Sequence, residues 1–409
     1  MKTNKTYLVG GAVRDALLGL RAAERDWVVV GSTASMMTDQ GYKQVGASFP
    51  VFLHPDNGEE YALARTEKKE GHGYHGFKVD FHPGVTLEED LLRRDLTINA
   101  IAQDEDGSLI DPFGGQKDIE QRVLRHVSDA FVEDPLRVLR VARFAARFAS
   151  FGFRVHESTL ALMDEITASG ELEHLAAERI WREIECAMAA DKPSEFVKVL
   201  RNCGALEALL PEVDALFGVP QPEKYHPEID TGVHLLMALD QAAALSKNDS
   251  SVVFAVLLHD LGKAVTPRQD WPSHRGHEAA GVPLVDAVCK RLRAPNMMHD
   301  LARKVCARHL DCHRLLEARP KTVLRLLENL DVFRQPQVLP GFTLACEADY
   351  RGRKGLQDRD YPQGAYLQSA HRAAAEISAR DLDLEGISGP EIGEKLRQAR
   401  TEAIKNLKP

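Results

Sequence analysis

The sequence predicts an α+β protein in which a small mixed sheet with helices is followed by an almost wholly helical remainder. Two observations carry this prediction. Up to about residue 110, short apolar, β-prone runs alternate with turns rich in Gly, Pro and Asn. From Phe131 onward, apolar residues recur mainly at helical spacing. The length of 409 residues is enough for two to four domains.

The composition argues against several classes of protein. Hydrophobic residues make up 44% and charged residues 28%, as in ordinary globular proteins. No run of 18 apolar residues occurs, and the N-terminus lacks the apolar core of a signal peptide. Six dispersed cysteines without C-x-x-C pairs indicate free thiols in a reducing cytoplasm. The net charge of −9 means that any RNA partner must be held by local basic patches.

The stretch from Tyr7 to Val30 contains the first candidate site. Tyr7–Val9 predicts a buried strand, and the adjacent Gly10 and Gly11 predict a turn whose N–H groups can approach a ligand closely. Ala12–Leu18 then has helical spacing. The turn does not fit a dinucleotide-binding motif, because its two glycines are adjacent and no third follows in register.

Two carboxylates precede the next predicted strand, Trp27–Val30. If the segment is extended, Glu24 and Asp26 point to the same face. Paired carboxylates beside a glycine turn could hold two divalent ions over a triphosphate, the arrangement needed for two-metal phosphoryl transfer. Taken alone, either feature is more often an ordinary turn or a solvated edge.

Further strands are predicted to complete a sheet with helices on one side, at Tyr42–Val45, Val51–His54, Glu60–Arg65 and Phe77–Phe81. The polar, glycine-rich segment Glu67–Gly76 predicts a mobile loop, and its two histidines, His72 and His75, are read as solvated. Thr86 and Glu89 form a capping box, which predicts a helix running to about Arg93.

A basic helix is predicted at Leu136–Phe148. Its arginines lie on one face at spacings of three, three and four residues: Arg137, Arg140, Arg143 and Arg147. Like charges on one face repel, so a triphosphate or an RNA backbone would stabilise this helix, although a solvated basic stripe is the alternative. Amphipathic helices follow at Glu157–Ala189 and Ser194–Leu210, and the proline-rich Asp214–Asp230 predicts a linker.

A second helical unit begins near Gly232 and is rich in potential metal ligands. Phe254–Leu258 is apolar, which places His259 and Asp260 at the end of a buried helix. An adjacent His-Asp pair can chelate one ion, with more ligands arriving from other helices. The candidates elsewhere in the unit are His234, His277, His309, Asp311 and Asp349.

Three motifs, in this order, resemble the class II tRNA nucleotidyltransferases, the CCA-adding enzymes of the polymerase-β-like superfamily. They are Gly10–Asp15 with Glu24-Arg25-Asp26, then Arg93–Ala100, then Glu133–Arg137. The family normally has Asp where this chain has Glu24. His259-Asp260 followed by Leu261-Gly262-Lys263 resembles the HD phosphohydrolases, which narrows the resemblance to CCA-adding enzymes with an HD domain.

The resemblance implies a nucleotidyltransferase head in which Glu24 and Asp26 are catalytic and bind two Mg²⁺ ions. Gly11 and Arg14 would hold the triphosphate of CTP or ATP, aided by Arg94 and Arg143. Hydrogen-bonding chemistry adds that Asp134 and Arg137, one helical turn apart, could read the amine and ring nitrogen that C and A share, supported by Arg140. The helical remainder would bind the acceptor arm of tRNA.

For the HD unit, the resemblance implies phosphatase and 2′,3′-cyclic phosphodiesterase activity with Ni²⁺ or another transition metal. The implied ligands are His234, His259, Asp260 and Asp349, with Asp311 as a rival to Asp349 and with His277 and His309 as auxiliary candidates. Two alternatives stay open: a phosphohydrolase or nucleotide-sensing regulator whose head only binds, and a poly(A) polymerase, which shares the head.

The expected division has four parts: a head (1–140), a helical neck and body that bind RNA (141–227), an HD domain (228–330, extending to about 355) and a helical tail (356–409). We expect a cytoplasmic protein with no membrane partner, either a monomer or a weak homodimer.

Overall fold

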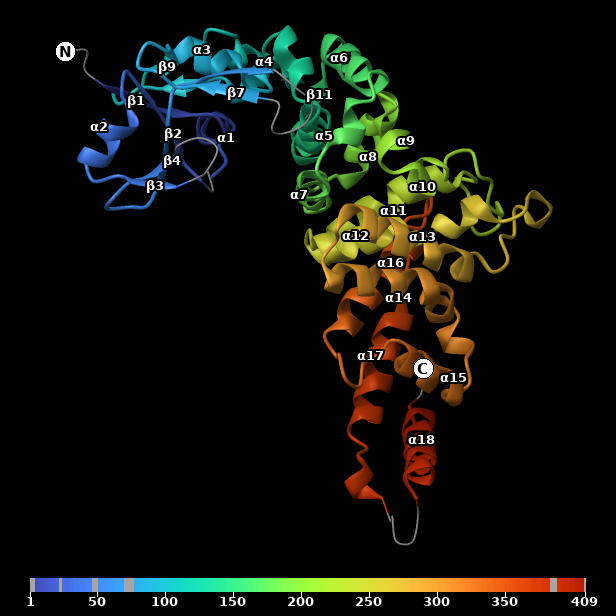
Figure 1. Cartoon of the computed structure of the whole chain (residues 1–409). Helices are drawn as coiled ribbons and strands as arrows, with labels where there is room; N and C mark the ends of the chain where they lie inside the picture. Colours follow the sequence, from blue (N-terminus) through green and yellow to red (C-terminus); the bar gives the residue numbers. More distant parts are fainter. Residues whose placement is uncertain (1–3, 22–23, 46–50, 70–76, 383–387, 408–409) are drawn as a thin grey trace. The chain divides into compact units, whose positions relative to one another are not determined.

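The computed structural model describes residues 4–21, 24–45, 51–69, 77–382 and 388–407 (Figure 1). The chain forms two compact units. The first contains Met1–Glu183 and Lys198–Leu209, and the second contains Ile184–Val197 and Leu210–Pro409. The four-part division remains a prediction, because these two units are coarser than it.

A seven-stranded mixed sheet forms the base of the first unit, in the order β3-β4-β5-β2-β1-β8-β9. The inner strand β1 is antiparallel to both β2 and β8, whereas the central strand β2 is parallel to β5. The strands are β1 (Lys5–Val9), β2 (Asp26–Val30), β3 (Lys43–Val45), β4 (Val51–Leu53), β5 (Glu60–Leu63), β8 (Ala102–Gln103) and β9 (Leu109–Ile110). The predicted mixed sheet is therefore confirmed.

One segment differs from its prediction. The expected loop from Glu67 begins as a strand, because β6 (Thr66–Lys69) pairs antiparallel with β7 (Phe77–Asp80). Residues 70–76, with His72 and His75, lie outside the described residues. The segment TEKK has no apolar residue, so hydrophobic periodicity could not indicate a strand there.

Both faces of the sheet are covered, and not one face as predicted. Val28 belongs to a buried cluster with Leu91 of α3 (Leu87–Leu92), whereas its neighbour Val29 packs in another cluster with Met37 of α2 (Ala34–Asp39). Successive side chains of a strand point to opposite faces. The uninterrupted apolar run Val28–Val30 therefore needs cover on both sides.

Helices complete the first unit. The short α1 (Gly11–Leu17) follows β1, and α3 has the predicted capping box at Thr86 and Glu89. The basic helix α5 spans Leu136–Phe148, as predicted. Its other helices are α4 (Gly115–Gln121), α6 (Glu157–Ala168) and α9 (Ala205–Leu209), and β10 (Val123–Leu124) and β11 (Arg154–Val155) form a small parallel pair. The helices α7 (Ala177–Met188) and α8 (Pro193–Asn202) belong partly to each unit.

In the second unit, every named element beyond Leu210 among the described residues is a helix. The centre of this unit is α12 (Ser250–Leu258), which is buried from Val252 to Leu258 and contacts α11, α14 and α16. The other helices are α10 (Pro211–Asp214), α11 (Thr231–Ser246), α13 (His277–Leu292), α14 (Asn296–His313), α15 (Pro320–Asn329), α16 (Val338–Arg351), α17 (Pro362–Ala375) and α18 (Gly389–Lys405). Within the described ranges, no helix has the length and hydropathy that crossing a bilayer requires.

Candidate functional site

The first site lies where β1 ends beside the start of β2. Asp26 is the first residue of β2 and pairs with Val9, so the Gly10–Gly11 turn begins next to it. Partial burial raises the pKa of Asp26, the Arg94 guanidinium opposes this, and the nearby Glu24 carboxylate adds to it. Both carboxylates are exposed. Two oxygen-bearing side chains that repel one another at an open edge suit a hard cation such as Mg²⁺.

Arg94 lies directly beneath the glycine turn. Gly10 has φ +69°, and a Cβ there would come within 2.7 Å of Arg94 Nη1, so only glycine lets the guanidinium approach this closely. Arg94 donates to the Asn99 carbonyl oxygen and to Asp90 Oδ2, both at 3.3 Å. The structure thus brings Arg94 to the turn next to Asp26, where the sequence alone could not place it.

Arg14 is buried and acts as a bridge within the head. Its guanidinium donates to Asp15 Oδ1 at 2.7–2.8 Å and to Asn99 Oδ1. It also lies over the Phe144 and Phe148 rings of α5, at 5.2 and 4.9 Å. In this arrangement Arg14 joins α1 to α5 beneath the Gly11 backbone.

Three of the four arginines on the basic face of α5 pair with carboxylates of the chain itself. Arg140 pairs with Asp95 at 2.7 Å and approaches Glu183 of α7 at 3.8 Å, while Arg143 donates to Glu183. Arg147 pairs with Asp15 at 2.8 Å. Internal carboxylates therefore relieve part of the repulsion that the spacing predicts, and binding of an external anion at this face stays a prediction.

The electrostatics of Asp95 reflect this pairing. Burial would raise the pKa of this carboxyl, but the charge and hydrogen bonds of Arg140, together with a hydrogen bond from Asn99, hold it well below its ordinary value. The pKa of Arg140 is raised in turn, chiefly by Asp95. Asp95 therefore stays ionised and holds the Arg140 guanidinium in place.

Asp134 and Arg137 lie at the N-terminal end of α5 and have different surroundings. Asp134 accepts from the Leu136 N–H at 3.1 Å and lies 3.5 Å from Arg179 of α7. Arg137 is buried and donates to the carbonyl oxygens of Ala130 and Arg93. The structure places both at one end of the helix and gives each a protein partner.

Three residues of this network were not selected from the sequence: Asp15, Asn99 and Glu183. Asp15 and Asn99 lie inside two of the quoted motifs, but spacing gives no indication that they hold Arg14. Glu183 carries a signal that could have been used. It interrupts the apolar face of α7, where Ile180, Ile184 and Ala187 are buried, and a buried carboxylate requires a cationic partner.

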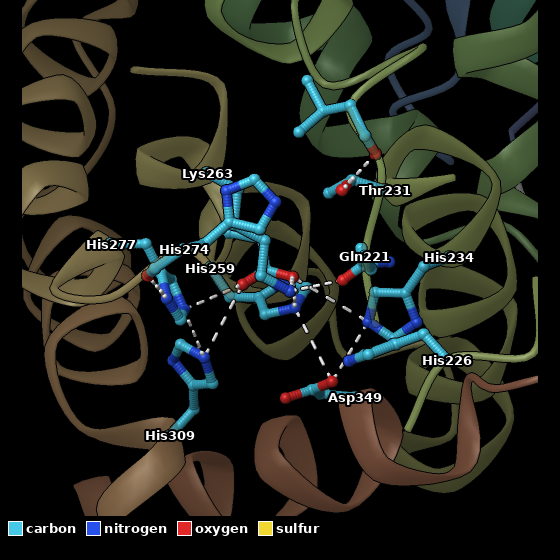
Figure 2. A network of polar contacts seen from close by, with 12 residues as sticks. Gln221, His226, Thr231, His234, His259, Lys263, His274, His277, His309 and Asp349 are labelled. Carbon is cyan, nitrogen blue, oxygen red and sulfur yellow. Dashed lines mark hydrogen bonds and ion pairs between the residues drawn. The ribbon is translucent and has the colours of Figure 1, made fainter. Parts of the chain in front are cut away.

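The second site joins α11, α12, α13, α14 and α16. His234 Nε2 lies 3.1 Å from Asp349 Oδ1, and His259 Nε2 lies 3.8 Å from the same oxygen. Asp260, beside His259, turns its Oδ1 toward His277 Nε2 and His309 Nε2, at 3.3 and 3.6 Å. Figure 2 shows these side chains converging from separate helices. Two groups of three potential metal ligands result.

The histidines present unprotonated nitrogens to the centre, because their other ring nitrogens contact backbone carbonyl oxygens. The Nδ1 atoms of His259, His277 and His309 lie 2.7, 2.9 and 3.1 Å from the carbonyl oxygens of Val256, His274 and Val305. A carbonyl only accepts, so each Nδ1 carries the proton and each Nε2 a lone pair. His277 Nε2 and His309 Nε2 then face one another at 3.3 Å.

These lone pairs fit a metal centre. Among the described residues, His259 Nε2 and Asp260 Oδ1 are buried and have no hydrogen-bond partner. Buried acceptors that converge without protons repel unless a cation lies between them. Imidazole combined with carboxylate is a ligand set typical of transition metals and zinc. These ligands therefore fit the implied metal. Asp260 belongs to the group with His277 and His309, and its neighbour His259 belongs to the group with His234 and Asp349.

The pKa shifts of His309 and Asp349 agree with ligand roles. Burial lowers the pKa of His309 to about 3, which keeps its imidazole neutral. Burial would raise the pKa of Asp349, but His313 and His234 hold it well below its ordinary range. Burial also disfavours protonated His259, yet the Asp260 and Asp349 carboxylates outweigh this and raise its pKa.

The structure brings Asp349 to the histidines, whereas Asp311 is exposed and pairs with Arg308 at 3.3 Å. His313, which the sequence did not indicate, lies 2.7 Å from Asp349 Oδ2 and orients that carboxylate. The sequence indicates His313 only weakly, because it follows His309 by one helical turn, and ordinary packed residues of a helix have the same spacing.

The predicted linker Asp214–Asp230 is not an extended connection. Pro220 and Asp230 form a β-bridge, and the loop between them sends side chains to the site. Glu228 Oε1 lies 3.0 Å from His226 Nδ1 and 3.2 Å from His234 Nδ1. Proline content signalled irregular backbone correctly, but it could not reveal that the loop is folded against a histidine cluster.

Three family models match the chain. The Poly A polymerase head domain matches residues 6–125, the probable RNA and SrmB-binding site of polymerase A matches residues 152–217, and the HD domain matches residues 231–334.

Known proteins resemble the chain over its whole length. A Multifunctional CCA protein of Thioalkalivibrio sulfidiphilus (strain HL-EbGR7) is 61% identical over 404 residues, which cover 99% of this chain and 98% of the relative. A solved CCA-adding enzyme, apo form II, has a TM-score of 0.67 at 21% identity, covering 99% of this chain and 89% of that one. The Thermotoga maritima CCA-adding enzyme complexed with tRNA-CCA has a TM-score of 0.59 at 19% identity, covering 98% and 87%. The two structures show the shared fold.

Proposed function

The chain belongs to the family of multifunctional CCA proteins, CCA tRNA nucleotidyltransferases with an HD phosphohydrolase domain, and from this premise we propose which residues carry each activity. One observation carries the proposal: the chain contains two separate groups of potential metal ligands. Paired carboxylates lie beside a glycine turn in the first unit, and a His/Asp cluster lies in the second.

In the head, Glu24 and Asp26 would hold two Mg²⁺ ions, which when bound activate the tRNA 3′-hydroxyl and neutralise the triphosphate. The Gly11 backbone would approach the phosphates, and Arg94, which already lies against the turn, would contribute positive charge. Arg14 supports this surface from below through Asp15 and Asn99. Arg143 would contribute from α5, where Glu183 holds it.

Base choice is assigned to Asp134 and Arg137, with Arg140 in support. An Asp carboxylate accepts from the exocyclic amine of C or A, and an Arg donates to the ring nitrogen. To read a base, Arg137 would have to exchange its bonds to the Ala130 and Arg93 carbonyls for bonds to that base.

Base choice can be tested with Asp134→Ala and Arg137→Ala on a tRNA primer with each of the four nucleotides. Selectivity should collapse toward weak use of GTP and UTP, because the matched hydrogen bonds that exclude them are gone. Variants that remain fully selective and fast would place base choice elsewhere.

In the second unit, His234, His259, Asp260 and Asp349 would hold a transition metal such as Ni²⁺, with His277 and His309 available for a second ion. A bound metal supplies an activated water for hydrolysis. The residues then serve phosphatase and 2′,3′-cyclic phosphodiesterase activity. His313 contacts Asp349 and Glu228 contacts His234, and these contacts would keep both ligands in the orientation that binds the metal.

The remaining proposals concern partners. We assign the acceptor arm of tRNA as substrate, with CTP and ATP as nucleotide donors, supported by the fold shared with an enzyme complexed with tRNA-CCA. The six free cysteines favour the cytoplasm as the compartment. A monomer or a weak homodimer is retained as the state in solution.

One experiment tests the main proposal. Purified protein is incubated with tRNA lacking its 3′ end and with labelled CTP and ATP, and the products are sequenced. We expect addition of CCA and no further residues. Extension by A alone would indicate a poly(A) polymerase, and hydrolysis without incorporation would indicate a phosphohydrolase whose head only binds.

A further inference from the structure

Gln221 lies at the base of the loop between Pro220 and Asp230 and is almost completely buried, at 2% exposure. Its backbone N–H donates to the Ile229 carbonyl oxygen at 2.6 Å, and the preceding Pro220 carbonyl lies 2.7 Å from His274 Nε2. These contacts fix the position of the residue. Its side chain extends into the His/Asp cluster (Figure 2).

The orientation of the Gln221 amide is determined by its neighbour. Lys263 Nζ lies 2.6 Å from Gln221 Oε1 and 2.6 Å from Asp260 Oδ2. A lysine ammonium only donates, so the atom that faces it must be the oxygen. The Nε2 group, with two N–H donors, consequently occupies the other arm of the amide.

That amide nitrogen is buried and, among the residues that the structure describes, has no hydrogen-bond acceptor. Folding normally avoids a buried donor without a partner, so such an atom in an enzyme site points to a ligand. His259 Nε2 and Asp260 Oδ1 share this state in the same cluster. Lys263 joins Gln221 Oε1 to Asp260 Oδ2, so the Gln221 amide adjoins the residues that could hold a metal.

We propose that Gln221 Nε2 donates a hydrogen bond to a non-bridging phosphate oxygen of the substrate hydrolysed at this site. The inference rests on the proposed phosphohydrolase function and adds the residue that recognises the phosphate. An oxygen acceptor is required, because Nε2 only donates. A phosphate supplies such oxygens beside a bound cation, whereas the Lys263 charge is already matched by Asp260.

The alternative is that Gln221 only positions Lys263. Two substitutions of similar size separate these roles. Gln221→Glu retains an oxygen for Lys263 but replaces the free donor by an acceptor. Gln221→Met removes both groups. If Gln221 acts only through Lys263, Gln221→Glu should behave as the wild type and Gln221→Met should not.

The measurement uses the full chain loaded with Ni²⁺. Binding of inorganic phosphate is measured by calorimetry, and KM and kcat are measured for a 2′,3′-cyclic nucleotide. We expect both variants to raise the phosphate Kd and the KM about tenfold or more, the usual cost of a hydrogen bond to a charged group. Ni²⁺ stoichiometry and the rate of CTP incorporation should stay at wild-type values, which shows that the variants are folded and loaded.

The outcomes are distinct. Loss of phosphate affinity in both variants supports the proposal, since either a missing donor or a repelling carboxylate acts only if the phosphate lies beside this arm of the amide. Normal affinity in Gln221→Glu overturns it, whether or not Gln221→Met is impaired. Normal affinity in Gln221→Met overturns it as well, because donation is then unnecessary. A wild-type protein that binds phosphate but hydrolyses nothing would refute the proposed function and leave the calorimetric comparison valid.

Discussion

The position of Asp26 in a strand fixes the carboxylate that we assign to a metal ion. As the first residue of β2 it is held by pairing on both sides, opposite Val9 and beside Glu60, yet its side chain stays exposed. Glu24 adds a second negative charge just before the strand and raises the pKa of Asp26. Two carboxylates that repel in the absence of a cation attract one strongly.

At this position, Asp26→Asn should abolish CTP and ATP addition, because the amide keeps the shape of the side chain but loses the charge that binds the ion. The loss should be of the order of several kcal/mol in transition-state stabilisation, at least about a thousandfold in rate. Glu24→Asp should retain activity, as it restores the residue common in the family. Product formation on a tRNA primer measures both. Near-normal addition by Asp26→Asn would refute the metal assignment, and unchanged hydrolysis at the second site serves as the control for folding.

Single residues also mark the limit of prediction from this sequence. Glu24 with Asp26, and His259 with Asp260, could be selected because the side chains that would bind a metal lie close together in the sequence. Gln221 could not, because the role proposed for it rests on its contact with Lys263, 42 positions away, and on an amide nitrogen that has no acceptor among the described residues. Long-range pairing of this kind has no local signal.

At the scale of elements, α5 is a scaffold for ordered arginines. Its periodicity predicted the helix and its basic face correctly. What the periodicity could not supply was the neighbouring element, because Asp95, Asp15 and Glu183 come from three separate segments. With internal partners, the arginines are fixed in place before any nucleotide binds. Such preorganisation lowers the cost of ordering long side chains during catalysis.

Glu183→Gln tests this role of the α5–α7 contact. The substitution leaves Arg143 beside a neutral amide and removes one of the two carboxylates near Arg140, so we expect a loss of about 1–3 kcal/mol in the stability of the head. Addition of CTP and ATP should slow, while hydrolysis at the His/Asp cluster should not change. Thermal unfolding and the two activity assays measure these effects. The matched control is Glu178→Gln, an exposed position on the same helix. Equal effects of the two substitutions would argue against a special role for Glu183.

At the scale of the whole molecule, the two candidate sites belong to different compact units. The mixed sheet and the helical remainder followed from hydrophobic periodicity, which each unit satisfies within itself. Periodicity did not predict that both faces of the sheet are covered or that the loop before α11 is folded, because both features depend on which segments meet in space. Stability should respond to pH in the second unit, because that unit carries buried histidines near its carboxylates.

Those histidines should make the metal-free second unit sensitive to acid. Burial lowers the pKa of His226 to about 3 and that of His309 to about 3, whereas an unfolded histidine titrates near its ordinary pKa of 6.5. Between pH 6.5 and about 4.5 the unfolded chain therefore binds protons that the folded unit does not. The free energy of unfolding must fall as the pH falls through this window, by up to about 1.4 kcal/mol per pH unit for each such histidine.

Denaturant unfolding of the chelated protein, followed by tryptophan fluorescence across this window, measures the slope. Of the three tryptophans, only Trp271 lies in the second unit, so a W27F/W181F background isolates its signal. His226→Gln should remove one contribution and flatten the slope by about 1.4 kcal/mol per pH unit or less. Burial would raise the pKa of Glu228, but hydrogen bonds from His226 and His234 hold it low. Because unfolded glutamate titrates near 4.5, Glu228 affects the free energy of unfolding only below this window. Stability that rises toward pH 4.5, or a slope that His226→Gln leaves unchanged, would show that His226 is not held neutral in the folded unit.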